Sequence, residues 1–354
     1  MKTRLQVFAL PFAVIMALIA TVVSLLCVRS WLIGDVSGVS NESEQMSINS
    51  DAGIDDSDSL ELGESIDVYS SSESVIRFLM KDVYARSTVP VVARDFIEVR
   101  AAPGAGVVTE AVYLEPMVIL SEQQSGWLKV KLPLQFGYEG YVERADVSEL
   151  PGANIESLAI VVSPNTWAMH SESGDRIRLL PLGALLPVTN SIGSAYQVRL
   201  LEGSTWVQAS EVTIITGNRP GITGDQIVKS ARMMLGTPYL WGGTVPDHLD
   251  CSGFVHLVFR LNGLIVPRDC SMQFNGSSQS SFDLAGLSPG DLIYLATYKD
   301  EASHVGIYAG NDLVIHASSR KGVVEETIAE STFSRHRILG CLKLADFVQA
   351  QPPE

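Results

Sequence analysis

The sequence predicts a mixed α+β domain preceded by two small all-β barrels, with an N-terminal transmembrane helix and a disordered linker ahead of them. Three observations support this prediction. A long uncharged stretch lies near the N-terminus, short β-rich runs bounded by turn residues fill the middle, and helical and strand patterns share the last third. The length of 354 residues suits two or three domains, since a domain usually takes about 100–200 residues.

Residues 1–33 are predicted to be a membrane anchor or a long signal segment. Residues 5–28 form 24 uncharged positions, preceded by Lys2 and Arg4. The stretch is longer than the hydrophobic region of a secretory signal peptide, which has roughly 7–15 residues. It matches the roughly 20 residues that an α-helix needs to cross a bilayer. The positive end is expected to stay in the cytoplasm, so the rest of the chain is placed outside the inner membrane. The alternative is a signal cleaved near residues 36–38, which would release the protein.

Residues 34–76 are predicted to be an acidic, Ser-rich disordered linker. Eleven Asp or Glu lie between Arg29 and Arg77, with no Lys or Arg among them. Such a composition cannot bury enough apolar surface to order itself. The stretch also accounts for most of the net charge of −15. The acidic balance argues against a general nucleic-acid binder, which needs a basic face to neutralise phosphates, although the rest of the chain carries a net charge of only about −4.

Residues 85–150 and 157–216 are predicted to be two small all-β units. In both segments short β-rich runs with aromatic and Val residues alternate with turn residues, as in residues 127–131 and 196–200, and the second run has the pattern aromatic-x-Val-x-Leu. Alternate residues that point inward suit a small barrel. The shared order of strand, Gly turn and aromatic-Val strand indicates a degenerate repeat.

Residues 220–348 are predicted to be the α+β domain. Thr223 and Gln226 have capping-box spacing, so a helix is expected from there to Gly236. A second helix is expected to begin at Cys251 and to end near Asn262. A thiol at a helix N-terminus is shifted toward the thiolate, which is the nucleophilic form. The competing interpretation is an ordinary buried cysteine.

A strand hairpin downstream carries two histidines, His304 and His316. With the turn centred near residue 310, the two would face each other across the ladder. A change of one residue in the length of the turn would make them diagonal neighbours, which are still within reach. One imidazole can take the proton of a nearby thiol while the second fixes its tautomer. We therefore predict that Cys251, His304 and His316 are catalytic.

Several motifs occur together in a fixed order. They are Tyr239-x-Trp241-Gly242-Gly243, Asp250-Cys251-Ser252-Gly253, Pro267-Arg268-Asp269, Gly290-Asp291-Leu292, His304-Val305-Gly306-Ile307-Tyr308 and Ile315-His316-Ala317-Ser318. Over residues 220–345 the chain resembles the NlpC family of papain-like cysteine peptidases. The resemblance implies that Cys251 attacks a peptide carbonyl, that His304 is the base and then the acid, and that His316 orients His304. It also implies an oxyanion site of backbone N–H groups near Cys251, assisted by the Tyr239 hydroxyl.

The two preceding units resemble the SH3-like barrels of bacterial wall proteins. They narrow the resemblance to γ-D-glutamyl-diamino-acid endopeptidases, which trim peptidoglycan stem peptides that have a free N-terminal L-Ala. The resemblance implies a substrate site of Tyr239, Asp250, Ser252, Asp269 and Cys270, with Tyr138 from the first barrel. Asp269 would pair with the free amino group. Glu98 is a weaker barrel candidate, and Cys270 stands where the subgroup tends to have a small hydroxyl residue.

The expected partners are stem peptides and, through residues 1–33, the inner membrane; the expected location is the cell envelope outside the cytoplasm, as a monomer. No cofactor or metal is expected. Three alternatives stay open. The nucleophile could act on another acyl bond as an amidase or acyltransferase, the barrels could form a wall-binding module, or His248, Cys251, His304 and His316 could hold zinc. The sequence does not choose between diaminopimelate and lysine in the substrate.

Overall fold

The computed structural model describes residues 71–171, 174–215, 221–275 and 284–349. All of them lie in one folding unit, residues 62–354. The predicted anchor or signal segment, residues 1–33, and the predicted linker up to residue 70 lie outside the described residues. Within the described part of the chain, no helix has the length and apolar character that crossing a membrane requires.

The described chain begins with helix α2, Ser72–Phe78, which continues into the π-helical turn η1, Leu79–Val83. The hydroxyl of Ser71 caps the helix by accepting a hydrogen bond from the Ser74 N–H at 3.1 Å. The side chains that face the protein interior are Val75, Ile76, Leu79 and Val83. The predicted linker was expected to continue to residue 76, but this helix already begins at Ser72, so that boundary is wrong. The apolar residues of the Val-Ile-x-x-Leu pattern lie on one face of a helix, and burial of that face orders the end of the Ser-rich stretch.

The first β unit, residues 88–151, follows the helix. Its strands are β1 Thr88–Val92, β2 Phe96–Arg100, β3 Val107–Val112, β4 Val118–Glu122, β5 Trp127–Leu132, β6 Tyr138–Glu143 and β7 Val147–Pro151, with 3₁₀ turns η2 Pro133–Gln135 and η3 Arg144–Asp146. Five strands form a sheet in the order β3-β2-β6-β5-β4, and β1 pairs with β7. Alternation along β5 buries Leu128, Val130 and Leu132. The β-rich character predicted for this segment is confirmed.

The second β unit, residues 157–215, is also β-rich. Its strands are β8 Ser157–Val161, β9 Trp167–Met169, β10 Arg176–Leu179, β11 Leu185–Ile192, β12 Ala195–Leu200, β13 Gly203–Gln208 and β14 Val212–Ile215, with the 3₁₀ turn η4 Ala209–Glu211. They form one sheet in the order β10-β9-β13-β12-β11-β8-β14. Because this connectivity differs from that of the first unit, the structure does not support the predicted repeat.

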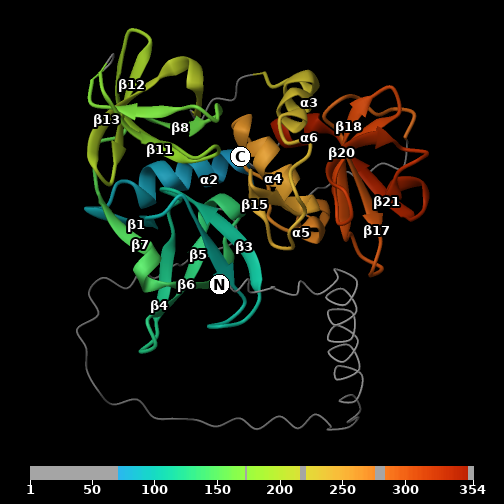
Figure 1. The fold of residues 1–354 in the computed structure, drawn as a ribbon, viewed down its shortest axis with the longest axis horizontal. Coiled ribbons are helices and arrows are strands. Elements are labelled where there is room, and N and C mark those ends of the chain that lie inside the picture. The colour runs from blue at the N-terminus through green and yellow to red at the C-terminus, as the bar shows by residue number, and fades with distance from the viewer. Residues whose placement is uncertain (1–70, 172–173, 216–220, 276–283, 350–354) are drawn as a thin grey trace, which may run out of the picture. The chain divides into compact units, whose positions relative to one another are not determined.

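The α+β domain, residues 224–349, is drawn in yellow to red in Figure 1. Its elements are α3 Gly224–Arg232, β15 Thr244–Val245, β16 His248–Leu249, α4 Cys251–Leu261, α5 Cys270–Asn275, β17 Leu292–Ala296, β18 His304–Gly310, β19 Leu313–Ser318, β20 Gly322–Thr327, the 3₁₀ turn η5 Thr332–Ser334, β21 Arg337–Leu342 and α6 Leu344–Gln349. The strands β17 to β21 form an antiparallel sheet in the order β20-β19-β18-β17-β21.

The predicted helix boundaries hold with one exception. Thr223 and Gln226 form the expected capping box of α3, and α4 begins at Cys251 as predicted. Helix α3 ends at Arg232, before the expected stop at Gly236. Of the residues between Arg232 and Gly236, Met234 is buried but Leu235 is exposed. This segment therefore has little apolar contact that would stabilise a further helical turn.

A buried polar interface joins the first β unit to the α+β domain. The Arg260 guanidinium on α4 pairs with Glu115 at 2.8 Å, and these side chains are 4% and 1% exposed. The other carboxylate oxygen of Glu115 accepts a hydrogen bond from the Gln135 amide at 3.1 Å. Nearby, Glu110 accepts a hydrogen bond from the backbone N–H of Thr244 at 2.9 Å. Since buried charges are tolerated only when they are paired, the two parts depend on each other for stability.

We expect Arg260→Leu to lower the free energy of unfolding by about 3–5 kcal/mol, because the Glu115 carboxylate would stay buried without its partner. The matched control is Arg232→Leu, which removes an ion pair with Glu325 in which the arginine side chain is 47% exposed. Exposed pairs contribute about 1 kcal/mol or less. Guanidinium denaturation of the two variants measures the difference, and equal small losses would contradict the prediction.

Candidate active site

Cys251 is the first residue of α4, and the loop before it fixes this position. The side chain of Asp250 caps the helix by accepting the Gly253 N–H at 2.7 Å, and it also accepts the Gly242 N–H at 2.9 Å. A Cβ on Gly253 would lie 2.0 Å from the carbonyl oxygen of Gly243. Only glycine therefore lets the helix start this close to the loop. The thiol thus meets the positive end of the helix dipole.

Arg268 forms a buried ion pair with Asp250. Its guanidinium is buried and donates to both carboxylate oxygens of Asp250, at 2.7 and 3.1 Å, and to the Ser252 hydroxyl at 3.0 Å. Its Nε donates to the Thr109 hydroxyl on β3 at 2.8 Å. The sequence placed Arg268 in a motif but gave it no role. One side chain therefore ties the cap of the nucleophile helix to the first β unit.

The two histidines meet as diagonal neighbours. His304 Nε2 lies 2.9 Å from His316 Nδ1, with the ring planes nearly perpendicular at 88°. The prediction that they lie directly opposite is wrong, because Ile307 pairs with Ile315 and the turn falls later than expected. The turn residues Asn311 and Asp312 both have positive φ, of 52° and 59°. The diagonal alternative is the observed one.

An aromatic ring packs against both imidazoles. The buried Phe333 lies 5.5 Å from His304 and 5.3 Å from His316, measured between ring centroids. A Cβ on Gly306 would lie 2.6 Å from the tip of this ring. The glycine in the His-Val-Gly motif therefore makes room for the ring that holds the histidines in place.

Glu326 extends the chain of hydrogen bonds and was not predicted. Its carboxylate lies 3.0 Å from His316 Nε2 and 2.7 Å from the Lys321 ammonium. Glu326 is on β20, where His316 pairs with Val324, so Glu326 is the diagonal neighbour of His316 on the same face. In the sequence, Glu326 is only a glutamate in the strand that follows His316. Its contact with His316 can be predicted only when the length of the turn between β19 and β20 is known.

These contacts determine where the protons lie. Burial and the charge of His304 lower the pKa of His316 to about 4, so this ring is neutral at pH 7. A carboxylate only accepts, hence His316 Nε2 carries the proton that bonds to Glu326. His316 Nδ1 is then an acceptor, and His304 Nε2 donates to it. This leaves Nδ1 of His304 for the thiol of Cys251.

The thiol of Cys251 is poised as a thiolate. A hydrogen bond from the Cys270 thiol is the largest effect that lowers the pKa of Cys251 to about 5, and the charge and hydrogen bond of His304 act in the same direction against burial. Burial and the interaction with Cys251 raise the pKa of Cys270. Both are free thiols, so Cys270 stays protonated and donates while Cys251 accepts. The Cys251 sulfur also lies 3.9 Å from the Ser303 carbonyl oxygen.

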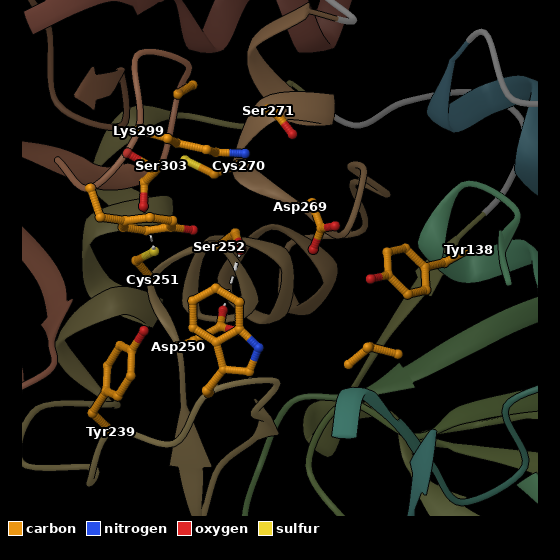
Figure 2. A pocket seen from close by; sticks show the side chains of 14 residues that line it. Tyr138, Tyr239, Asp250, Cys251, Ser252, Asp269, Cys270, Ser271, Lys299 and Ser303 are labelled. Carbon is orange, nitrogen blue, oxygen red and sulfur yellow. Dashed lines mark hydrogen bonds between the residues drawn. The ribbon is translucent and has the colours of Figure 1, made fainter. Parts of the chain in front are cut away.

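A cavity of about 160 Å³ adjoins Cys251 on the side of the first β unit. The predicted substrate residues all line it, namely Tyr138, Tyr239, Asp250, Ser252, Asp269 and Cys270. Figure 2 shows Tyr138 reaching from the first β unit toward Asp269, with Tyr239 and Cys251 across the cavity. Burial and the nearby charge of Asp269 raise the pKa of Tyr138 to about 12, so it remains a hydroxyl donor. Trp241, Tyr298 and Lys299 also line the cavity and were not predicted.

A second cavity, of about 650 Å³, adjoins Cys251 on the side of the histidines. Both cavities share the residues Tyr239, Trp241, Cys251, Tyr298 and Ser303, so they meet at Cys251. A substrate that lies across Cys251 would thus occupy both.

The remaining candidates lie elsewhere. Glu98 is on β2, forms an ion pair with Arg100 and lines neither cavity. His248 lies 3.3 Å from Glu110. In the described ranges no three His, Cys, Asp or Glu side chains are arranged to hold a metal ion, so the zinc alternative has no support. The buried ring of His256 bonds to the Val266 carbonyl through Nδ1 at 2.9 Å, and burial lowers its pKa to about 3.

A helix that begins at a cysteine and packs on a sheet that presents two histidines defines a papain-like domain. Residues 236–341 match the NlpC/P60 family model, so the chain contains an NlpC/P60 family domain. The gamma-D-glutamyl-L-lysine dipeptidyl-peptidase of Bacillus subtilis is 24% identical over 238 residues, which cover 65% of this chain and 79% of that protein.

Two further relatives cover different shares of the chain. The "Probable peptidoglycan endopeptidase LytE" of Bacillus subtilis is 40% identical over 94 residues, 27% of each chain. The crystal structure of an NlpC/P60 family protein from Bacillus cereus has a TM-score of 0.61 at 20% identity and covers 72% of this chain and 98% of that one. The fold similarity thus includes the β-rich region as well as the NlpC/P60 domain.

We expect Cys270→Ala to raise the apparent pKa of Cys251 by about one unit, because the thiolate would lose its strongest donor. Cys270→Ser keeps a hydroxyl donor and should shift it less. The measurement is the rate of iodoacetamide alkylation between pH 4 and 9, followed by mass spectrometry of the peptide that contains Cys251. An identical pH profile in wild type and Cys270→Ala would refute the role of Cys270.

Proposed function

We propose that this protein is a cysteine endopeptidase of the cell envelope that acts on peptidoglycan stem peptides. It hydrolyses the bond between the γ-carboxyl of D-Glu and the diamino acid in peptides with a free N-terminal L-Ala. The observation that carries the proposal is the thiol of Cys251, backed by His304 and His316, beside a cavity that contains Asp269 and Tyr138. The NlpC/P60 domain and the peptidase names of its relatives support it.

The proposed reaction proceeds through an acyl-enzyme. The Cys251 thiolate attacks the carbonyl carbon of the scissile bond, and backbone N–H groups at the start of α4 with the Tyr239 hydroxyl stabilise the oxyanion. His304 donates its proton to the leaving amine as the C–N bond breaks. Water then attacks the thioester while His304 takes its proton, and the carboxylate product leaves with the thiolate restored.

Selection of the amino terminus is proposed to occur at the cavity end formed by the first β unit. Asp269 presents a carboxylate there, and Tyr138 adds a hydroxyl. An ammonium group fits this pair by charge, while an acylated nitrogen has no charge to offer. Val108 of the same β unit also lines this end. The proposed SH3-like unit thus contributes to substrate choice besides any role in wall binding.

The proposed setting follows from the N-terminal sequence. Residues 1–33 would anchor the protein in the inner membrane, or be cleaved after export, and residues 34–70 would space the enzyme from the membrane. Nucleic acid is not a proposed partner, since the chain carries a net charge of −15.

We expect the wild-type protein to release L-Ala-D-Glu from a synthetic L-Ala-γ-D-Glu-diamino-acid tripeptide and Cys251→Ala to release none, because the acyl-enzyme cannot form. Mass spectrometry of the digest gives the products. An intact tripeptide with wild type, or undiminished cleavage by Cys251→Ala, would overturn the proposal.

The same digest tests the amino-end site. N-acetylation of the tripeptide should lower kcat/KM by at least about tenfold, and Asp269→Asn should remove most of that preference, because the charge pair would be lost. The matched control is Glu98→Gln, which changes a carboxylate outside both cavities. Equal cleavage of free and acetylated peptides by the wild type would favour an amidase or acyltransferase with a different acyl specificity.

We expect Glu326→Gln to lower kcat about tenfold, since Glu326 holds the tautomer of His316. The matched control is Glu325→Gln, whose carboxylate pairs with Arg232 outside the hydrogen-bonded chain. The pH profile of kcat provides a second readout, because a merely structural loss would not move its limbs. Unchanged kcat with an unchanged profile would remove Glu326 from the mechanism.

A further inference from the structure

The larger cavity, on the histidine side of Cys251, is lined by several charged side chains. In the proposed reaction the acyl part of the substrate occupies the smaller cavity, because the amino-end site lies there. The leaving amine then occupies the larger one. Its charged lining residues come from the segment after β19 and from the segment around η5, and they are Arg320, Lys321, Glu326, Glu330 and Arg335.

The charges in this cavity are not evenly matched. The Lys321 ammonium and the Glu326 carboxylate lie 2.7 Å apart and neutralise each other. Arg320 has no ion-pair partner in the described part of the chain, and the Arg335 guanidinium donates only to the backbone carbonyl of Glu330, at 3.3 Å. The Glu330 carboxylate accepts a hydrogen bond from the Thr327 hydroxyl at 3.0 Å. Two guanidinium groups thus remain available to a ligand against one carboxylate.

We propose that Arg320 and Arg335 bind a carboxylate carried by the leaving diamino acid. The inference rests on the proposed function and adds the chemistry of the leaving group to it. A guanidinium recognises a carboxylate through two parallel hydrogen bonds, which a neutral amide cannot reproduce. The smaller cavity presents the carboxylate of Asp269 with the ammonium group of Lys299, and the larger one presents the guanidinium groups of Arg320 and Arg335. With the amino end of the peptide at Asp269, its carboxylate would lie on the side of the two arginines.

The carboxylate has two possible sources with the same chemistry. It is either the side-chain carboxyl group of diaminopimelate or the free α-carboxyl group of a diamino acid at the C-terminus. The test therefore uses four tripeptides of the form L-Ala-γ-D-Glu-X. In two of them X is lysine, with a free or an amidated α-carboxyl group. In the other two X is diaminopimelate with its α-carboxyl amidated, and its side-chain carboxyl is free or amidated.

We expect wild type to lose about fivefold or more in kcat/KM when the recognised carboxyl group is amidated. The pair in which the loss occurs identifies the source. The double variant Arg320→Gln, Arg335→Gln should cleave both members of that pair equally, with the fully amidated peptide cleaved as by wild type. Arg337→Gln is the matched control, because Arg337 is exposed and cationic but does not line the cavity.

The outcomes separate the inference from the proposed function. Cleavage of all four peptides by wild type at equal rates would overturn the inference and leave the proposed peptidase activity intact. A carboxylate preference that survives in the double variant, or that Arg337→Gln abolishes equally, would also overturn it. Cleavage of none of the four peptides would overturn the proposed function, and this inference with it.

Discussion

The position of Cys251 depends on one buried ion pair, between Arg268 and Asp250. Asp250 caps α4 and bonds to the loop before it, so it determines where the helix begins. Arg268 neutralises this carboxylate in the interior and reaches the first β unit through Thr109. A buried carboxylate without such a partner would be strongly destabilising. The cap that positions the thiol is therefore held by an ion pair within the α+β domain, and the Thr109 hydrogen bond links that pair to the first β unit.

His304 is held in a different way, by hydrogen bonds between side chains on three adjacent strands. His304, His316 and Glu326 lie on β18, β19 and β20, and each bonds to the next. The register of the antiparallel strands determines which side chains are diagonal neighbours. The sheet therefore places the hydrogen-bond donors and acceptors of these three residues next to one another. The ring of Phe333 packs against both imidazoles. The site thus combines a helix terminus with a sheet surface.

Local sequence patterns were sufficient for the features that depend on local rules. The capping box at Thr223, the helix that begins at Cys251 and the hairpin that carries the two histidines follow from cap chemistry and alternation. The register of that hairpin did not, because the turn residues Asn311 and Asp312 shift the pairing. The position of Glu326 beside His316 depends on the length of a second turn, the one between β19 and β20. The role of Arg268 depends on a contact with residue 109, which is remote in sequence. Such contacts carry no periodic signal.

The placement of the first β unit against the groove limits what can enter it. Tyr138 and Val108 of this unit line the smaller cavity beside Asp269. Under the proposed function, a stem peptide still joined to the glycan through its L-Ala nitrogen lacks the ammonium group that Asp269 would bind. Under the same proposal, an amide-cleaving reaction elsewhere would have to detach the peptide first, and the intact wall would be spared.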